Sequence, residues 1–180
     1  LADDDVVVNL QGDEPFVDFN DINNVADLLK DRAVDMGTLY ADLKIEDVIN
    51  PNVVKIWTKK NGQVTDFSRN EEKTSDKKLT RSQHLGIYAY RVKFLKDFIN
   101  WKQTENEKIE SLEQLRALEG GKNIYAKKSV AKIHLGIDTP EDLHLAHKLI
   151  ENDWYQKKVY ESIILLYEKN LHYKEILIWK

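Results

Sequence analysis

Short apolar runs and amphipathic segments alternate along this chain of 180 residues. Strands are predicted where β-branched or aromatic residues form short runs bounded by turn residues, and helices where apolar residues recur every three or four positions. The predicted strands are 6–10, 36–41, 53–58, 63–67, 84–90, 123–127 and 132–135. The predicted helices are 18–30, 92–99, 109–118 and 140–150, with a helical turn at 45–48 and amphipathic segments at 159–167 and 176–179. Strands that alternate with helices indicate an α/β sheet.

Turn residues separate these segments and divide the chain. Asn61-Gly62 is typical of a tight hairpin turn, and Thr139-Pro140 is typical of a helix start. The polar stretch 70–81 is predicted to be a loop. We expect one α/β domain over residues 1–153, followed by a helical tail of unknown role over 154–180.

Composition narrows the possible partners. The net charge of −4 and the pI near 5.8 give no electrostatic reason to expect nucleic-acid binding. The absence of cysteine excludes disulfides and thiolate chemistry, and it is compatible with a cytoplasmic location. No apolar run approaches the roughly 20 residues that span a bilayer, and the acidic first residues do not resemble a signal peptide. His144 and His147 are expected to be a surface pair rather than a zinc site.

Two acidic turns follow two of the predicted strands. Asp13 follows the apolar run 6–10, and Asp138 follows the run 133–137. In open α/β sheets ligands bind beyond the carboxyl ends of the strands, where such carboxylates would lie. Two carboxylates can share one hard cation, and Mg²⁺ prefers oxygen ligands of this kind. We therefore predict that Asp13 and Asp138 bind Mg²⁺, which in turn favours phosphate chemistry. The alternative is a purely structural role, in which Asp13 forms a turn before Pro15 and the second acidic turn only starts a helix.

Four motifs in register carry a more specific resemblance. They are Val7-Val-Asn-Leu-Gln-Gly-Asp-Glu-Pro15, His84-Leu-Gly-Ile-Tyr-Ala-Tyr-Arg91, Ile109-Glu-Ser-Leu-Glu-Gln-Leu-Arg116 and Gly136-Ile-Asp-Thr-Pro-Glu-Asp-Leu143. Over about residues 4–150 the chain resembles the 3-deoxy-manno-octulosonate cytidylyltransferases, also called CMP-Kdo synthetases. Asn50-Pro-Asn-Val-Val-Lys55 and Phe67-Ser-Arg69 fit the same pattern.

The resemblance implies a fold and a reaction. The fold would be a three-layer α/β/α arrangement with a mixed, mainly parallel sheet of the nucleotide-diphospho-sugar transferase type. The reaction would transfer CMP from CTP to the anomeric hydroxyl of 3-deoxy-manno-octulosonate (Kdo) and release pyrophosphate, for lipopolysaccharide biosynthesis. The family also implies a cytoplasmic homodimer, for which 94–101 and 163–167 offer apolar residues.

Eight site residues follow from the same resemblance. Asp13 and Asp138 would be the catalytic Mg²⁺ ligands, and the sugar-acid pocket would be lined by Gln11, Arg69, His84, Tyr88, Glu113 and Gln114. Arg69 suits the sugar carboxylate because a guanidinium can form a bidentate pair. Each residue also has a plain structural interpretation: Arg69 as a surface ion pair, His84 and Tyr88 as core residues, and Glu113 and Gln114 as a solvated helix face.

The chain departs from the family pattern in two places. It lacks the Gly/Arg/Lys-rich nucleotide-binding loop and starts at what would be a middle strand, so the first βαβ portion is expected to be absent. The segment 69–84 is also shorter than in the family. These departures leave two alternatives open: a CMP-sugar synthetase for another sugar acid, or an inactive fragment that folds, dimerises and binds sugar acid weakly.

Overall fold

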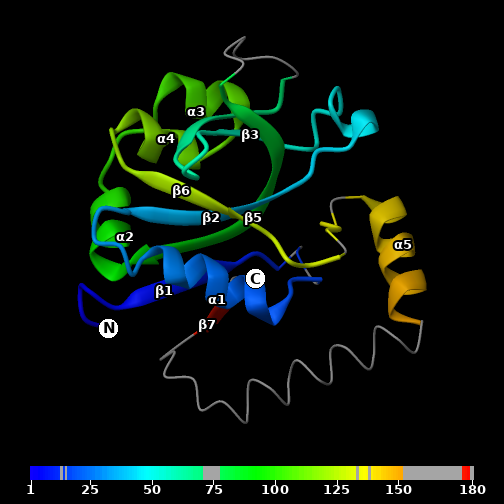
Figure 1. The fold of residues 1–180 in the computed structure, drawn as a ribbon, viewed down its shortest axis with the longest axis horizontal. Helices are drawn as coiled ribbons and strands as arrows, with labels where there is room; N and C mark the ends of the chain where they lie inside the picture. The colour runs from blue at the N-terminus through cyan, green and yellow to red at the C-terminus, as the bar shows by residue number, and fades with distance from the viewer. Residues whose placement is uncertain are drawn as a thin grey trace.

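The computed structural model describes residues 1–12, 14, 16–70, 78–132, 134–137, 139–151 and the strand at 176–178. Its strands are β1 (Val6–Leu10), β2 (Met36–Ala41), β3 (Lys55–Thr58), β4 (Val64–Ser68), β5 (Thr80–Arg91), β6 (Ile124–Lys128) and β7 (Ile176–Ile178) (Figure 1). Its α-helices are α1 (Phe19–Leu28), α2 (Val92–Phe98), α3 (Glu105–Glu110), α4 (Gln114–Glu119) and α5 (Pro140–Ile150), and a 3₁₀ turn, η1, covers Ile45–Asp47. Within these described ranges no helix is long and apolar enough to cross a membrane.

The sheet is built on β5, whose 12 residues allow it to pair with three other strands. β1, β2 and β3 all run antiparallel to β5, and β4 runs antiparallel to β3. β6 joins β2 in parallel, and β7 joins β1 in parallel. The sheet is therefore mixed, as predicted. The expectation of a mainly parallel sheet is wrong for the described strands, because the long β5 runs opposite to all of its neighbours.

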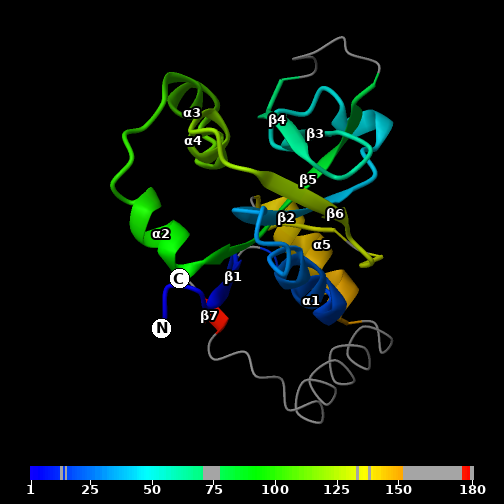
Figure 2. The same cartoon turned by 60° about the vertical axis from the view of Figure 1, so that its left-hand side comes forward.

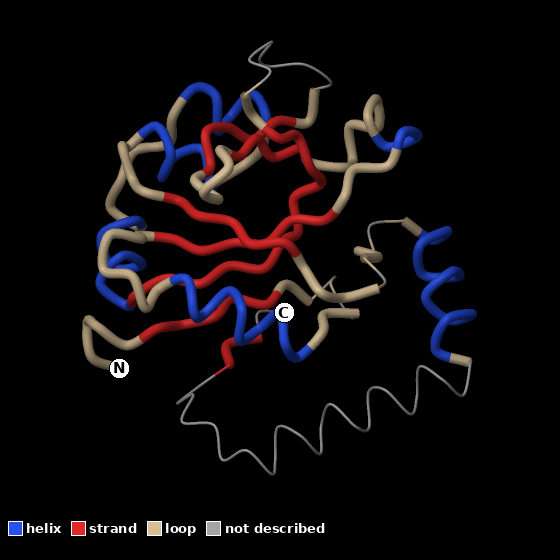
Figure 3. Tube along the Cα trace, viewed as in Figure 1, coloured by secondary structure: helices blue, strands red, loops and turns tan. Residues whose placement is uncertain are grey.

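Two hydrophobic cores lie on opposite faces of this sheet. Side chains alternate along a strand, so Ile87 and Ala89 of β5 belong to one core while Tyr88 and Tyr90 belong to the other. The first core is covered by α1, and the second by α2, α3 and α4 (Figures 2 and 3). This arrangement confirms the three-layer α/β/α architecture.

Helix α1 packs very closely against β2. The carboxylate of Asp18 caps the helix by accepting a bond from the backbone N–H of Asn20 at 2.9 Å. At Gly37 of β2, an added Cβ would come within 3.0 Å of the carbonyl oxygen of Val25 and 3.1 Å of a methyl group of Leu29. Glycine suits this close approach, because an added methyl group would require its neighbours in and beside α1 to move by a few tenths of an ångström.

Several predicted elements are found with the same bounds. The strands predicted at 6–10 and 36–41 are β1 and β2, and the helix predicted at 140–150 is α5. The tight turn at Asn61-Gly62 is also confirmed, with Gly62 at a φ of 86°. The division at residue 153 stays a prediction. The segment 159–167 lies outside the described residues, and the described part of the predicted helical tail, Ile176–Ile178, is a strand.

The single helix predicted over 109–118 is wrong. Two short helices replace it, because Ser111 adopts a left-handed conformation with a φ of 53° and ends α3. Ile109 is 76% exposed, whereas Leu112 and Leu115 are buried in the core beside Tyr88. The three-residue apolar spacing that indicated one helix face therefore runs across the break between α3 and α4.

The strand predicted over 132–135 is also wrong, since the described residues of this segment belong to no strand. After β6 the chain turns towards α1, where the buried carboxylate of Asp21 gathers three donors. It accepts bonds from the backbone N–H of Val130 (2.9 Å), the backbone N–H of Ala131 (3.3 Å) and the hydroxyl of Ser129. These bonds fix the loop that directly precedes the segment predicted as a strand.

Candidate active site

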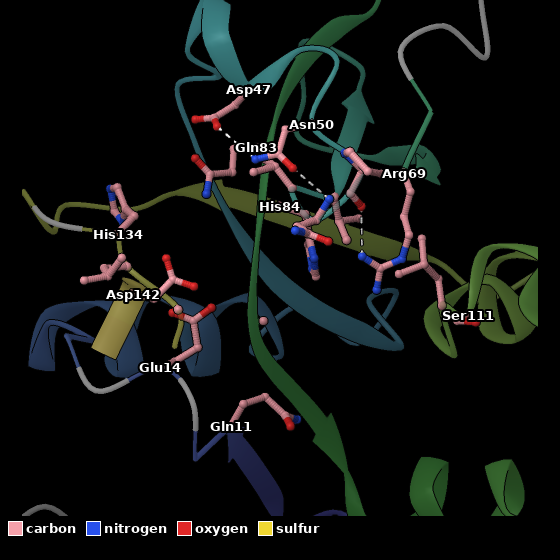
Figure 4. A pocket seen from close by; sticks show the side chains of 18 of the residues that line it. Gln11, Glu14, Asp47, Asn50, Arg69, Gln83, His84, Ser111, His134 and Asp142 are labelled. Atoms are coloured by element: carbon pink, nitrogen blue, oxygen red, sulfur yellow. Dashed lines mark hydrogen bonds between the residues drawn. The ribbon is translucent and has the colours of Figure 1, made fainter. Parts of the chain in front are cut away.

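One large pocket opens beside the carboxyl end of β1 and the middle of β5. Its volume is about 1100 Å³. Side chains reach it from the segment after β1, the 44–54 segment, the end of β4, the middle of β5, the α3–α4 turn and the start of α5 (Figure 4). All six residues predicted to bind the sugar acid line this pocket: Gln11, Arg69, His84, Tyr88, Glu113 and Gln114. The sequence separates them by up to about a hundred positions, and the fold brings them together.

A bulge in β5 shapes the floor of the pocket. The β2–β5 register shifts between Thr38, which lies opposite Tyr88, and Leu39, which lies opposite Leu85. Two residues of β5, Gly86 and Ile87, are therefore inserted relative to β2. Bulges bend a strand and redirect its side chains, which is why they occur beside binding sites.

The hydroxyl of the fully buried Thr38 fills the bulge and orients His84. It lies 2.9 Å from the carbonyl oxygen of Ile87, 3.3 Å from that of Leu85 and 2.9 Å from Nε2 of His84. A hydroxyl has one proton, and here that proton goes to a carbonyl oxygen, so Thr38 Oγ1 accepts from Nε2–H of His84. This places the imidazole proton on Nε2 and leaves Nδ1 as an acceptor.

His84 is neutral at physiological pH. Burial lowers its pKa from 6.5 to about 3, because the apolar surroundings disfavour the charged imidazolium. Its ring packs edge-on against Phe67, with ring centroids 5.1 Å apart, and against the tilted ring of Tyr88, at 5.5 Å. A neutral, fixed imidazole is suited to accepting a hydrogen bond from a ligand hydroxyl.

Arg69 presents an unneutralised positive charge to the pocket. Its Nε donates to the carbonyl oxygen of Glu110 at 3.0 Å, and its Nη1 donates to that of Pro51 at 3.1 Å. In the described part of the chain the guanidinium makes these two bonds and no ion pair, which leaves Nη2 and one Nη1 proton for a ligand. The interpretation of Arg69 as a surface ion pair is thus wrong.

The remaining predicted residues differ in exposure. Tyr88 is buried and lines the pocket, whereas Tyr90 is held in the core, where its hydroxyl accepts from Asn9 Nδ2 at 3.1 Å. Gln114 is 3% exposed at the first position of α4, while Glu113 precedes it with an exposed side chain. A solvated helix face is therefore wrong for Gln114, since its side chain is buried against the pocket.

The two predicted metal ligands, Asp13 and Asp138, lie outside the described residues. Their neighbours in sequence, Glu14 and Thr139, line the pocket. Asp142 also lines it, but its carboxylate caps α5 by accepting from the backbone N–H and the hydroxyl of Thr139, at 2.9 and 2.8 Å. Among the described residues no group of three or more acidic or histidine side chains could hold a metal ion. As a donor set, two carboxylates fit Mg²⁺ because it takes hard oxygen ligands.

The structure adds pocket residues that were not among the predicted site residues. They include Lys44, Asp47, Gln83, Ser111 and His134. His134 has a lowered pKa, chiefly because it is partly buried, while Asp21 nearby opposes that effect. It follows the loop that Asp21 holds, so its position depends on a contact between residues 108–110 positions apart. No local pattern signals such a contact.

Comparison with known proteins agrees with this geometry. A family model described as Cytidylyltransferase matches residues 1–124. The 3-deoxy-manno-octulosonate cytidylyltransferase 2 of Actinobacillus pleuropneumoniae serotype 5b is 40% identical over 164 residues, which cover 84% of this chain and 65% of that protein. The 3-deoxy-manno-octulosonate cytidylyltransferase of Photobacterium profundum is 41% identical over 160 residues, covering 83% and 64%. This chain thus spans slightly less than two thirds of the length of these relatives.

Solved structures show the same fold. A CMP:2-keto-3-deoxy-manno-octonic acid synthetase complexed with CTP superposes with a TM-score of 0.72 at 30% sequence identity, over 81% of this chain and 61% of that one. A putative glucose-1-phosphate thymidylyltransferase from Bacillus anthracis, with a TM-score of 0.55 and 16% identity, shares the fold alone. The family match, the identity to the relatives and the shared fold together show that this chain belongs to the cytidylyltransferase family.

Proposed function

We propose that the chain forms the sugar-acid-binding part of a 3-deoxy-manno-octulosonate cytidylyltransferase. The enzyme would transfer CMP from CTP to the anomeric hydroxyl of Kdo. The observation that carries this proposal is the pocket itself, which is lined by a guanidinium free of any described carboxylate, a neutral imidazole and a buried amide. A sugar acid offers one carboxylate and several hydroxyls, which is the complementary set of groups.

The pocket residues divide the recognition between charge and hydroxyl contacts. Arg69 pairs with the sugar carboxylate through its free N–H groups, because a guanidinium and a carboxylate match geometrically. His84 accepts from a hydroxyl through Nδ1, and Gln114 can both donate and accept. Glu113 accepts from a further hydroxyl, while Tyr88 and Gln11 complete the wall. A site of buried polar groups disfavours sugars that lack the matching hydroxyls, since these groups would then stay unpaired.

The transfer step exchanges one bond to phosphorus for another. The anomeric hydroxyl of Kdo loses its proton to solvent as its oxygen attacks the α-phosphorus of CTP, the bond from that phosphorus to the bridging oxygen breaks, and pyrophosphate leaves. Catalysis of this kind rests on positioning and charge neutralisation. Asp13 and Asp138 would hold Mg²⁺, which when bound stabilises phosphate charge and activates the attacking oxygen. The protein residues of the pocket fix the sugar so that its anomeric hydroxyl is the group presented to the nucleotide.

Two further features belong to the same proposal. A homodimer is favoured by the apolar surface of α2 and the segment after it, where Ile99 is 77% exposed beside Phe98 and Trp101. A cytoplasmic location is favoured by the use of CTP and by the absence of cysteine.

Pyrophosphate release from CTP, Kdo and Mg²⁺ tests the proposal. Wherever pyrophosphate is released, we expect the Asp13→Ala, Asp138→Ala double variant to abolish that release. The matched control is Asp27→Ala, Asp97→Ala, which removes two aspartates held in exposed ion pairs with Lys30 and Lys93 and should leave the rate unchanged.

Kdo binding to the same chain separates the alternatives. Saturable Kdo binding without pyrophosphate release would mean that the chain supplies the sugar site and lacks the rest of the enzyme, as expected for an inactive fragment. A competing sugar acid that binds at least tenfold more tightly than Kdo would replace the substrate named here. Absence of both binding and release would contradict the proposal.

A further inference from the structure

Arg69 is held by the protein at four separate points. Its guanidinium donates to the carbonyl oxygens of Glu110 and Pro51. Its backbone N–H donates to Oε2 of Glu110 at 2.9 Å, and its backbone carbonyl oxygen accepts from Nζ of Lys55 at 3.0 Å. These four bonds restrain both the backbone and the guanidinium of Arg69.

Glu110 is the main anchor. Its side chain is buried, with 6% of the residue exposed, and it uses both carboxylate oxygens on the segment around Arg69. Oε1 accepts from the hydroxyl of Ser68 at 2.9 Å and from Nδ2 of Asn70 at 3.1 Å, while Oε2 accepts from Arg69 N–H. Glu110 therefore binds three consecutive residues at the end of β4. It is also the last residue of α3, directly before the left-handed turn that exposes Ser111 to the pocket.

Lys55 holds the opposite side of the same segment. The residue is fully buried at the start of β3. Its Nζ donates to the carbonyl oxygen of Asn50 at 2.6 Å and to that of Arg69 at 3.0 Å. It thereby joins the 50–54 wall of the pocket to the strand end that carries Arg69. Fully buried lysines are rare because their desolvation is costly, and they are retained where their bonds fix a structure.

We propose that Glu110 and Lys55 are positioning residues of the sugar-acid site, which act by fixing Arg69 so that its free N–H groups meet the ligand carboxylate. This inference rests on the proposed function and names residues that need not touch the ligand. A flexible arginine loses side-chain entropy when it binds, whereas a held one has already lost it. The held guanidinium also stays at a fixed distance from His84 and Gln114, which allows carboxylate and hydroxyls to be bound together.

The central variant is Glu110→Gln, which keeps the size of the side chain and removes its charge. The amide oxygen of glutamine can still accept hydrogen bonds as one carboxylate oxygen did. Its N–H₂ group takes the place of the other carboxylate oxygen and would face a donor, with which it cannot form a bond. The matched control is Glu105→Gln on the same helix, because Glu105 makes an exposed ion pair with Lys108. Ser68→Ala is a milder variant that removes one bond to Glu110 at a buried position. It decides the question if Glu110→Gln does not fold.

The first measurement needs no ligand. In NMR spectra of the wild-type chain, the Arg69 Nε–H should exchange slowly with solvent because it is bonded to the Glu110 carbonyl oxygen. We expect exchange at least about tenfold faster in Glu110→Gln, an intermediate value in Ser68→Ala and no change in Glu105→Gln. An unchanged Arg69 signal in folded Glu110→Gln, or in Ser68→Ala if the first variant is unfolded, would overturn the proposal.

The second measurement asks whether the ligand carboxylate senses the change. The ratio of the affinities for Kdo and for its C1 amide reports contact with Arg69. We expect Glu110→Gln to lower this ratio about tenfold, with no further loss when it is combined with Arg69→Ala. Equal losses for both ligands would indicate a merely structural role and would contradict positioning. A wild-type chain that binds Kdo and its amide equally would instead refute the proposed function, and the exchange measurement would still decide the role of Glu110.

Discussion

Thr38 offers the sharpest test of how the pocket floor is built. Its hydroxyl is the group that joins the β5 bulge to His84, and replacing Thr38 with valine removes the hydroxyl while nearly preserving the side-chain shape. In the described part of the chain, Nε2 of His84 has no other hydrogen-bond partner. The variant therefore leaves a buried polar atom unsatisfied and also deletes the one bond that the hydroxyl donates to the nearby carbonyl oxygens of Ile87 and Leu85.

The expected cost follows from these contacts. An unsatisfied buried donor costs about 1–3 kcal/mol, and a lost bond to a carbonyl oxygen that keeps other partners costs about 0.5–1.5 kcal/mol. Thr38→Val should thus lower the free energy of unfolding by about 2–4 kcal/mol. Thr38→Ser keeps the hydroxyl and loses one methyl group, so it should cost only about 1 kcal/mol. Thr65→Val, which removes a single half-buried bond to the Trp57 carbonyl oxygen, should cost less than about 1.5 kcal/mol.

Urea unfolding followed by tryptophan fluorescence measures all three variants on one scale. We expect Thr38→Val to lower the free energy of unfolding most, and Thr38→Ser and Thr65→Val to lower it less. The slope of that free energy against urea concentration should be unchanged in all three variants. A Thr38→Val variant within about 0.5 kcal/mol of the wild type would refute the reasoning, because that is the range of an ordinary surface substitution. It would mean that Thr38 does not fix the His84 ring.

Three other predictions concern pH, the 129–131 loop and helix packing. The pKa of His84 is about 3 in the folded chain and near 6.5 in the unfolded chain. As the pH falls from 7.5 to 5.5, only the unfolded state therefore takes up this proton, which lowers the free energy of unfolding. Over this range the wild type should lose about 1.4 kcal/mol more of that free energy than His84→Gln, as measured by urea unfolding. Asp21→Ala orphans two backbone N–H groups and should cost about 2–4 kcal/mol, with faster amide exchange over 129–137, whereas Asp27→Ala should do neither. Gly37→Ala should lower the thermal midpoint by several degrees because its methyl group would meet the backbone of α1, and a midpoint equal to that of the wild type would contradict the close packing described above.

Local sequence patterns correctly predicted the elements whose ends are set by neighbouring residues. The run 6–10 is flanked by a turn on one side and by Gly12 on the other, and it became β1 with unchanged bounds. Thr139 and Pro140 set the start of α5 because capping is a property of neighbouring residues. By contrast, the strand predicted at 84–90 starts too late. β5 begins at Thr80, because its polar first residues pair with β3, a separate strand earlier in the sequence.

The errors arise where distant contacts override the local pattern. The sequence around Ser111 does not indicate a left-handed conformation. The break at Ser111 depends on distant contacts, because it places Leu112 and Leu115 in the core formed with β4 and β5. The segment after β6 has the apolar residues of a strand, but its described residues form a loop, whose first residues are bonded to the carboxylate of Asp21. The mainly parallel sheet was implied by the resemblance, and the antiparallel pairs of β5 overturn it for the described strands.

The candidate site shows the same division. The six pocket residues could be named from motifs because the resemblance covers them, and the fold brings them to one pocket. Glu110 lies within one of those motifs, but its role as an anchor depends on contacts across 40–42 positions of sequence. The metal-binding role of Asp13 and Asp138 stays a prediction.

The most direct test of the account is a titration of the isolated chain with Kdo, followed by backbone NMR. The account predicts saturable shifts concentrated at the pocket residues Gln11, Arg69, His84 and Gln114, and their loss in Arg69→Ala but not in the control Glu105→Gln. Shifts that spread over other surfaces, or that persist unchanged in Arg69→Ala, would contradict the claim that this pocket binds the sugar acid through its carboxylate.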